Sequence, residues 1–148
     1  MSVDQKELPE IIEWRKQLES LYAQIRAWLA EMELPPVIET HPMRLLEKKS
    51  GEYEVSQLLV RRGNGEFRVR PIAKWVVGAD GRVDLEGGDG PFLLVRMVGT
   101  VAHVSHEATS RLDEKDHGGW FWVQDRPPWK RIPLTGDLFR GLAESCLE

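Results

Sequence analysis

Residues 9–33 read PEIIEWRKQLESLYAQIRAWLAEME, and this stretch decides how the chain folds. Its large apolar side chains recur at spacings of three and four, which is the pattern of an amphipathic helix with one continuous apolar stripe. Pro9 suits the first turn of such a helix, and Pro35-Pro36 would end it because proline cannot donate a backbone hydrogen bond. We therefore predict a helix over residues 9–33. Its apolar stripe consists of Ile11, Trp14, Leu18, Leu21, Ile25, Trp28 and Met32.

The length of this helix suggests a second role for its stripe. At 1.5 Å per residue the helix is about 36 Å long, which is more than a small sheet needs as cover. We therefore expect part of the stripe to form an interface with a second chain, and the alternative is that the whole stripe packs in the chain's own core. The expected interface residues are Trp14, Leu18, Leu21, Ile25 and Trp28.

The rest of the chain has the pattern of a sheet followed by a short helix. Residues 34–51, LPPVIETHPMRLLEKKSG, are rich in proline and predict an irregular connector. Residues 52–134 contain β-rich runs separated by glycine and proline turns, which predicts about five to seven hairpin-linked antiparallel strands. Asn64-Gly65 is the strongest hairpin signal, and Thr135 is a candidate N-cap for a helix over 136–147. The predicted fold class is α+β, in a single domain over residues 1–148.

Composition and charge restrict the classes of function. The chain has 148 residues, of which 41% are hydrophobic and 30% charged, and a net charge of −4. A mildly acidic chain with dispersed charge argues against non-specific nucleic-acid binding. Cys146 is the only cysteine, and the opening MSVDQKELPE has no apolar segment, so we expect a cytoplasmic protein without a membrane span. No dinucleotide or phosphate-loop motif is present, so no cofactor is expected.

Histidines and carboxylates are concentrated between residues 103 and 117. His103 and His106 are three residues apart, which on a strand places them on opposite faces. His106 with Asp116 and His117 remains a candidate metal set, since imidazole and carboxylate groups suit zinc or manganese. The alternative is a solvated, charged loop.

A basic hairpin over residues 61–74 is the candidate anion site. Alternation along the strand would place Arg68, Arg70 and Lys74 on one face, opposite Phe67 and Val69. Such a face could bind an anion or nucleic acid, and it could equally be the solvated face of a half-exposed strand.

The order of a helix followed by a strand hairpin resembles the core of the PD-(D/E)XK nucleases. The resemblance rests on Asp84 at a strand end, with Glu86 beside it and Arg96 at the place of the family's lysine. It implies a metal-dependent hydrolase in which paired carboxylates hold a divalent ion. The family's Glu-x-Lys motif is missing, because the next strand reads Leu93-Leu94-Val95-Arg96-Met97.

The expected function is therefore protein association without catalysis. The chain would act as a homodimer or as a small subunit of a larger assembly. The alternative is a metal-dependent hydrolase that uses Asp84 and Glu86 or the set around His106.

Overall fold

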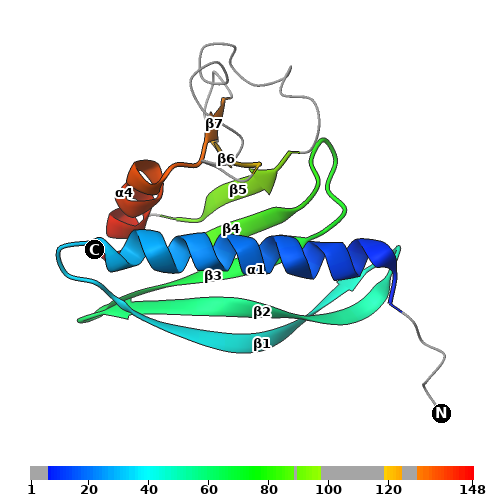
Figure 1. The fold of residues 1–148 in the computed structure, drawn as a ribbon, viewed down its shortest axis with the longest axis horizontal. Coiled ribbons are helices and arrows are strands. Elements are labelled where there is room, and N and C mark those ends of the chain that lie inside the picture. The colour runs from blue at the N-terminus through cyan, green and yellow to red at the C-terminus, as the bar shows by residue number, and fades with distance from the viewer. Residues whose placement is uncertain (1–6, 89, 98–118, 125–129) are drawn as a thin grey trace.

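A computed structural model describes residues 7–88, 90–97, 119–124 and 130–148, which form two helices and one sheet (Figure 1). The seven strands are hydrogen-bonded in the order β1-β2-β3-β4-β5-β6-β7, and every neighbouring pair is antiparallel. This confirms the predicted α+β fold class with a hairpin-linked sheet. In chain order, the helices and strands of the described residues have the following bounds: α1 (Pro9–Ala30), β1 (Val37–Glu47), β2 (Gly51–Arg62), β3 (Gly65–Ala73), β4 (Arg82–Gly87), β5 (Phe92–Arg96), β6 (Trp120–Val123), β7 (Arg131–Pro133) and α4 (Gly136–Leu147).

Helix α1 lies across one face of the sheet, and α4 lies beside its C-terminal end (Figure 1). The helix begins at Pro9, as predicted, and ends at Ala30, three residues before the predicted end. The rings of Trp14 and Trp120 lie 6.2 Å apart, and those of Trp28 and Phe139 lie 5.5 Å apart. The core between helix and sheet therefore joins α1 to β6 at one end and to α4 at the other.

Strand β1 occupies the segment that the sequence indicated as an irregular connector, so that expectation requires correction. It pairs with β2 along its whole length, from Val37 opposite Arg61 to Glu47 opposite Gly51. Pro42 lies in the middle of β1, and β1 is the first strand of the sheet. An edge strand tolerates proline because the missing N–H can lie on the side away from the partner strand. Proline content alone was therefore misleading.

The hairpin between β2 and β3 turns on Gly63-Asn64 rather than on the expected Asn64-Gly65. Arg62 pairs with Gly65, which leaves a two-residue turn. Gly63 has φ of 60°, and no residue other than glycine has positive φ in the described chain, so glycine occupies the first turn position. This register places Leu58 in the core with α1, while Leu59 lies on the other face of the sheet.

Helix α4 matches the predicted range of 136–147. Its first turn is capped by Thr135, whose hydroxyl oxygen accepts a hydrogen bond from the Leu138 N–H at 3.2 Å. Its C-terminal end lies directly on Gly65: a Cβ there would be 2.0 Å from the carbonyl oxygen of Leu147. The C-terminal end of α4 can therefore approach the sheet this closely because Gly65 has no side chain.

An ion pair between Arg62 of β2 and Glu144 of α4 should make part of the stability depend on pH. The guanidinium donates to both carboxylate oxygens, at 2.8 and 2.7 Å, and this hydrogen bonding lowers the pKa of Glu144. A depressed folded-state pKa stabilises the fold above the ordinary glutamate pKa of about 4.3, and the contribution is lost as the pH falls through the folded value. The pair is half-exposed, so we expect a coupling free energy of at most about 1 kcal/mol.

A double-mutant cycle of Arg62→Gln and Glu144→Gln, followed by urea unfolding, measures this coupling. The coupling should be present at pH 7 and should decline once the pH is below about 4.3. A coupling of the same size at neutral and at strongly acidic pH would contradict the assignment.

Candidate functional site

The two candidate catalytic carboxylates lie on the face of the sheet that α1 does not cover. Val83 and Leu85 of β4 belong to the core under α1, so alternation places Asp84 and Glu86 on the opposite face. Asp84 is buried and accepts two hydrogen bonds from Arg82, at 2.8 and 2.9 Å, which raise the pKa of the Arg82 guanidinium. Glu86 forms an ion pair with Arg70 at 3.3 Å. Each carboxylate thus has an arginine as its counter-ion.

Arg96, the third candidate, lies on the other face of the sheet from Asp84. It follows Leu94 by two residues on β5, and Leu94 is part of the core with α1. Its guanidinium donates to Asp80 at 3.0 Å, and the other oxygen of Asp80 accepts from the Lys74 ammonium. The structure therefore does not bring Arg96 together with Asp84 and Glu86.

The expected anion site on the basic hairpin is also divided. Arg68 and Arg70 are exposed on the face of the sheet opposite α1, where Arg68 contacts Gln57 and Arg70 pairs with Glu86. Lys74 is buried, with 6% of its surface exposed, and binds Asp80 instead. The register shift between Pro71 and Ala73 breaks the strict alternation on which the prediction depended. Lys74 is therefore not on the face of Arg68 and Arg70.

Glu47 at the end of β1 fixes the backbone around Lys74. Its carboxylate accepts hydrogen bonds from the N–H groups of Lys74 and Trp75, at 3.0 and 3.1 Å, and from the Tyr53 hydroxyl. Burial, and then the hydrogen bond to Glu47, raises the pKa of Tyr53 far above its ordinary value. This clamp positions Lys74 to reach Asp80.

The metal candidates His106, Asp116 and His117 lie outside the described residues. In the part of the chain that the structure describes, no three His, Cys, Asp or Glu side chains are grouped closely enough to hold a metal ion.

The five expected interface residues lie within the fold of one chain. Trp14, Leu18, Leu21 and Ile25 are at most 2% exposed, and Trp28 is partly buried against Phe139. This arrangement matches the alternative in which the whole stripe packs in the chain's own core. The helix runs lengthwise along the long strands β1 and β2 (Figure 1), so its length corresponds to theirs.

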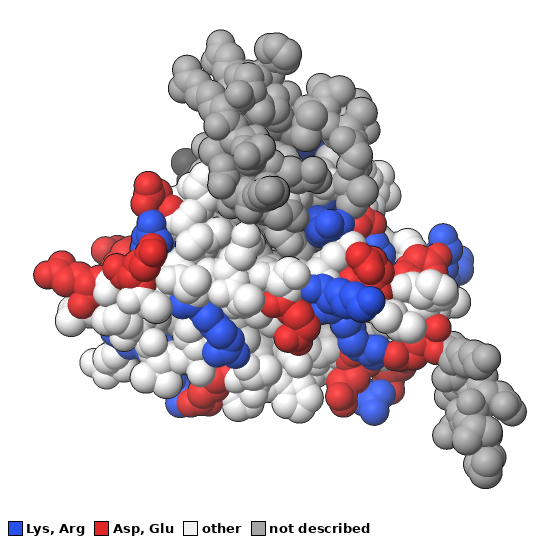
Figure 2. Space-filling model, in the orientation of Figure 1, with Lys and Arg blue, Asp and Glu red and all other residues white. Residues whose placement is uncertain are grey.

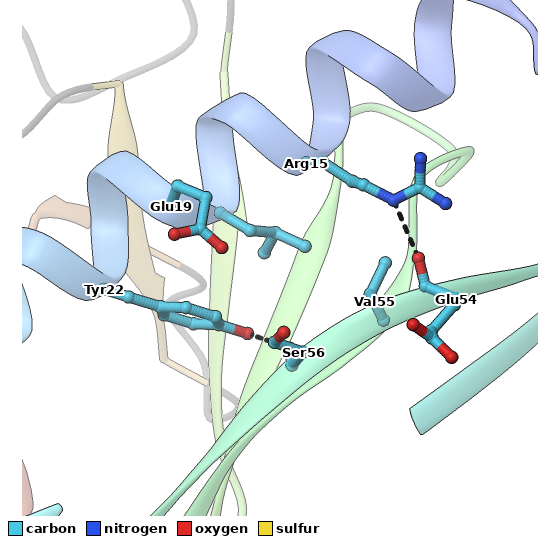
Figure 3. A pocket seen from close by; sticks show the side chains of 7 residues that line it. Arg15, Glu19, Tyr22, Glu54, Val55 and Ser56 are labelled. Atoms are coloured by element: carbon cyan, nitrogen blue, oxygen red, sulfur yellow. Dashed lines mark hydrogen bonds between the residues drawn. The ribbon is translucent and has the colours of Figure 1, made fainter. Parts of the chain in front are cut away.

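One flank of α1 is joined to β2 around a small pocket of about 150 Å³ (Figure 3). The Tyr22 hydroxyl donates to the carbonyl of Ser56 at 2.6 Å, and the Arg15 Nε–H donates to the carbonyl of Glu54 at 2.8 Å. Strand β3 pairs with β2 only from Leu58 onward, so these carbonyls lie beyond the paired part of the two strands. Burial raises the pKa of Tyr22 strongly, which keeps its hydroxyl a donor. We interpret this pocket as a helix–strand junction.

The other flank of α1 forms a larger groove with the ends of β5 and β6. This α1 groove has a volume of about 430 Å³. Arg96 was a candidate from its place in the sequence, but a helix flank that is more than 70 residues away in the chain leaves no local signal of their contact. The side chains that line the groove include Glu13, Lys16, Gln17, Gln24, Arg96 and Trp120.

Positive and negative side chains are interspersed over the α1 side of the molecule, and Figure 2 shows no continuous basic area among the described residues on that side. This distribution lacks the clustered cations that phosphate backbones attract. Neither described helix combines the length and the apolar character that a membrane crossing requires.

Comparisons of the chain with protein-family models, with curated proteins and with solved structures found no match.

Proposed function

We propose that this chain is a non-enzymatic domain that works by binding another protein. The observation that carries the proposal is the separation of the candidate catalytic residues. Asp84 and Glu86 lie on the face of the sheet opposite α1, and Arg96 lies on the helix face. Hydrolysis by a metal-activated water needs carboxylates that converge on one ion, with a cation beside the reacting group.

The ion pairs of the two carboxylates support the same proposal. A carboxylate that accepts two hydrogen bonds from an arginine has lost much of its capacity to bind a divalent cation, because the guanidinium already neutralises it. Asp84 is held in this way by Arg82, and Glu86 is paired with Arg70. The geometry therefore argues against a hydrolase that uses Asp84 and Glu86.

Titration calorimetry with Mg²⁺, Mn²⁺ and Zn²⁺ tests the non-enzymatic part of this proposal. We expect the full chain to give no stoichiometric heat that depends on Asp84 or Glu86. Glu86→Gln is the informative variant, since Glu86 lies at the surface, and Asp137→Asn, a substitution at an exposed carboxylate of α4, is the matched control. Stoichiometric metal binding that disappears in Glu86→Gln and persists in Asp137→Asn would overturn the proposal.

A further inference from the structure

We propose that β1 pairs, edge to edge and antiparallel, with β1 of a second copy of this chain. The inference rests on the proposed function and names a protein that the chain binds. Three features of β1 support it: its position at the edge of the sheet, a change of face at its centre, and side chains that complement their own sequence read in reverse.

Strand β1 is the long edge of the sheet. It pairs with β2 over all of its 11 residues, and in the part of the chain that the structure describes no strand lies on its other side. The opposite edge, β7, has only 3 residues. In Figure 1, β1 forms the lower rim of the molecule, and α1 lies over the sheet without covering this rim. A strand edge of this length presents backbone N–H and C=O groups that another strand can bind.

The side chains of β1 change faces once, near its centre. Thr40 accepts a hydrogen bond from Arg26 of α1, and Met43 packs against the core under the same helix. Residues three apart lie on opposite faces of a regular strand, so the alternation shifts by one residue at His41-Pro42. The helix face of β1 therefore carries Ile38, Thr40, Met43 and Leu45, and the other face carries Val37, Glu39, Arg44 and Leu46.

This change of face gives β1 a self-complementary register. A twofold axis between His41 and Pro42 pairs each residue with a residue of the second copy that lies on the same face of the joined sheet. In a strand with regular alternation these partners would lie on opposite faces, so the register would not be available. The pairs are Val37 with Leu46, Ile38 with Leu45, Glu39 with Arg44, and Thr40 with Met43, each joining one copy to the other.

The apolar ends of β1 support this register. Val37 is 64% exposed and Leu46 is 77% exposed. In the proposed dimer each of them covers the other, once at either end of the interface. A register shifted by two residues would instead place Val37 opposite Arg44 in one direction, or Glu39 opposite Leu46 in the other, and would lose these contacts.

The charged pair also specifies the register. Glu39 already pairs with Arg61 of β2 at 3.4 Å, and Arg44 pairs with Glu52 at 2.9 Å. All four side chains lie at the surface, so in the dimer they would form a row of alternating charge that crosses the interface. Opposite charges directly across two strands are favourable and like charges are unfavourable.

Pro42 limits the pairing to two short segments. Proline on an edge strand discourages pairing because it has no N–H to donate. It lies here at the proposed axis, where the alternation already shifts, so residues 37–40 and 43–46 remain able to pair. Because each paired segment is short, we expect a weak and reversible dimer.

The test is sedimentation velocity of the full chain. The wild type should be mainly monomeric at about 5 μM and mainly dimeric at about 500 μM. Arg44→Glu places glutamates opposite each other, and Glu39→Arg places arginines opposite each other. Each variant alone should therefore raise the dissociation constant about tenfold or more. Both residues are at the surface, so Glu39→Arg remains informative if Arg44→Glu does not fold.

A mixture of the two variants is the sharpest measurement. In a mixed dimer both charged pairs again join a glutamate to an arginine, so equimolar Arg44→Glu and Glu39→Arg should associate about as tightly as the wild type. Arg68→Glu is the matched control. It makes the same change of charge at an exposed residue of β3, away from the edge, and should leave the dimer unchanged.

Pairing through β1 also stabilises the folded chain as its concentration rises, because association favours the folded state. Any comparison of α1 between protein concentrations is therefore made with Arg44→Glu, which we expect to remain largely monomeric.

Three outcomes would overturn the inference. A wild type that stays monomeric at about 500 μM would exclude the second copy and leave the edge to a strand of a different protein. A dimer that Arg44→Glu weakens no more than Arg68→Glu does would have its contact elsewhere on the chain. Variants that fail to associate when mixed would exclude this register. In each case, calorimetry that still shows no metal binding would leave the non-enzymatic assignment in place.

Discussion

Leu21→Glu is expected to leave the protein unfolded. Leu21 has no exposed surface and lies at the middle of the α1 stripe, between the helix and the sheet. The substitution buries a carboxylate in an apolar core and also removes a packed apolar side chain, which costs more than about 4 kcal/mol. That is comparable with the whole stability of a domain of this size. Circular dichroism should show no cooperative thermal transition.

Ala27→Glu is the matched control, since Ala27 lies on the exposed side of the same helix. It should change the unfolding free energy by no more than about 0.5 kcal/mol. A Leu21→Glu protein that unfolds cooperatively with nearly unchanged stability would contradict the packing of α1 in the core. It would be the expected result if Leu21 were instead part of a contact between chains.

Deleting residues 135–148 is expected to abolish cooperative unfolding as well. Helix α4 contributes five buried side chains, and without it Leu134, which has no exposed surface, would lose its cover. Losing several large core side chains costs more than about 5 kcal/mol in total. Loss of the sharp transition in thermal unfolding is the measurement. The buried residues of α4 are Phe139, Leu142, Ala143, Cys146 and Leu147.

Gly141→Ala is the control for this deletion, because it changes a residue of α4 without removing the helix. An added Cβ at Gly141 meets no atom within 4 Å, and alanine favours a helix interior by about 1 kcal/mol over glycine. This variant should therefore be slightly more stable than the wild type. A truncated chain that melts as sharply and at the same temperature as the full chain would show that α4 is dispensable.

The helices and the sheet were predictable because their signals are local. Seven apolar residues at spacings of three and four can face one sheet only from a helix, and six of the seven are buried in the core. The N-cap at Thr135 and the periodic residues after it likewise define α4 without any long-range information.

Features that depend on position in the sheet were not predictable. Pro42 argues against a strand unless β1 is known to be the edge of the sheet. Strict alternation places Lys74 on the same face as Arg68 and Arg70, and only the register shift between Pro71 and Ala73 removes it from that face. Val77 is a large apolar residue in a β-rich run and is nevertheless fully exposed. In each case the residue type is compatible with both environments, and tertiary pairing decides between them.

The candidate site was the part of the structure that could be predicted least from the sequence. Arg96 was identified for its place in a strand, and Gln17 lay on the flank of a helix, but neither sequence pattern indicates that they line one groove. The signal that unites them is the antiparallel sheet order, which brings the end of β5 beneath the N-terminal half of α1.

Native-state hydrogen exchange of α1 at two protein concentrations tests most directly whether its stripe is used inside one chain. The amides from Leu18 to Ile25 should be protected to the level of global unfolding, equally at about 5 μM and at about 500 μM. Equal protection is the predicted result, because the sheet of the same chain covers the stripe. Protection that rises with concentration would show that a second chain completes this core, and would contradict the packing described above.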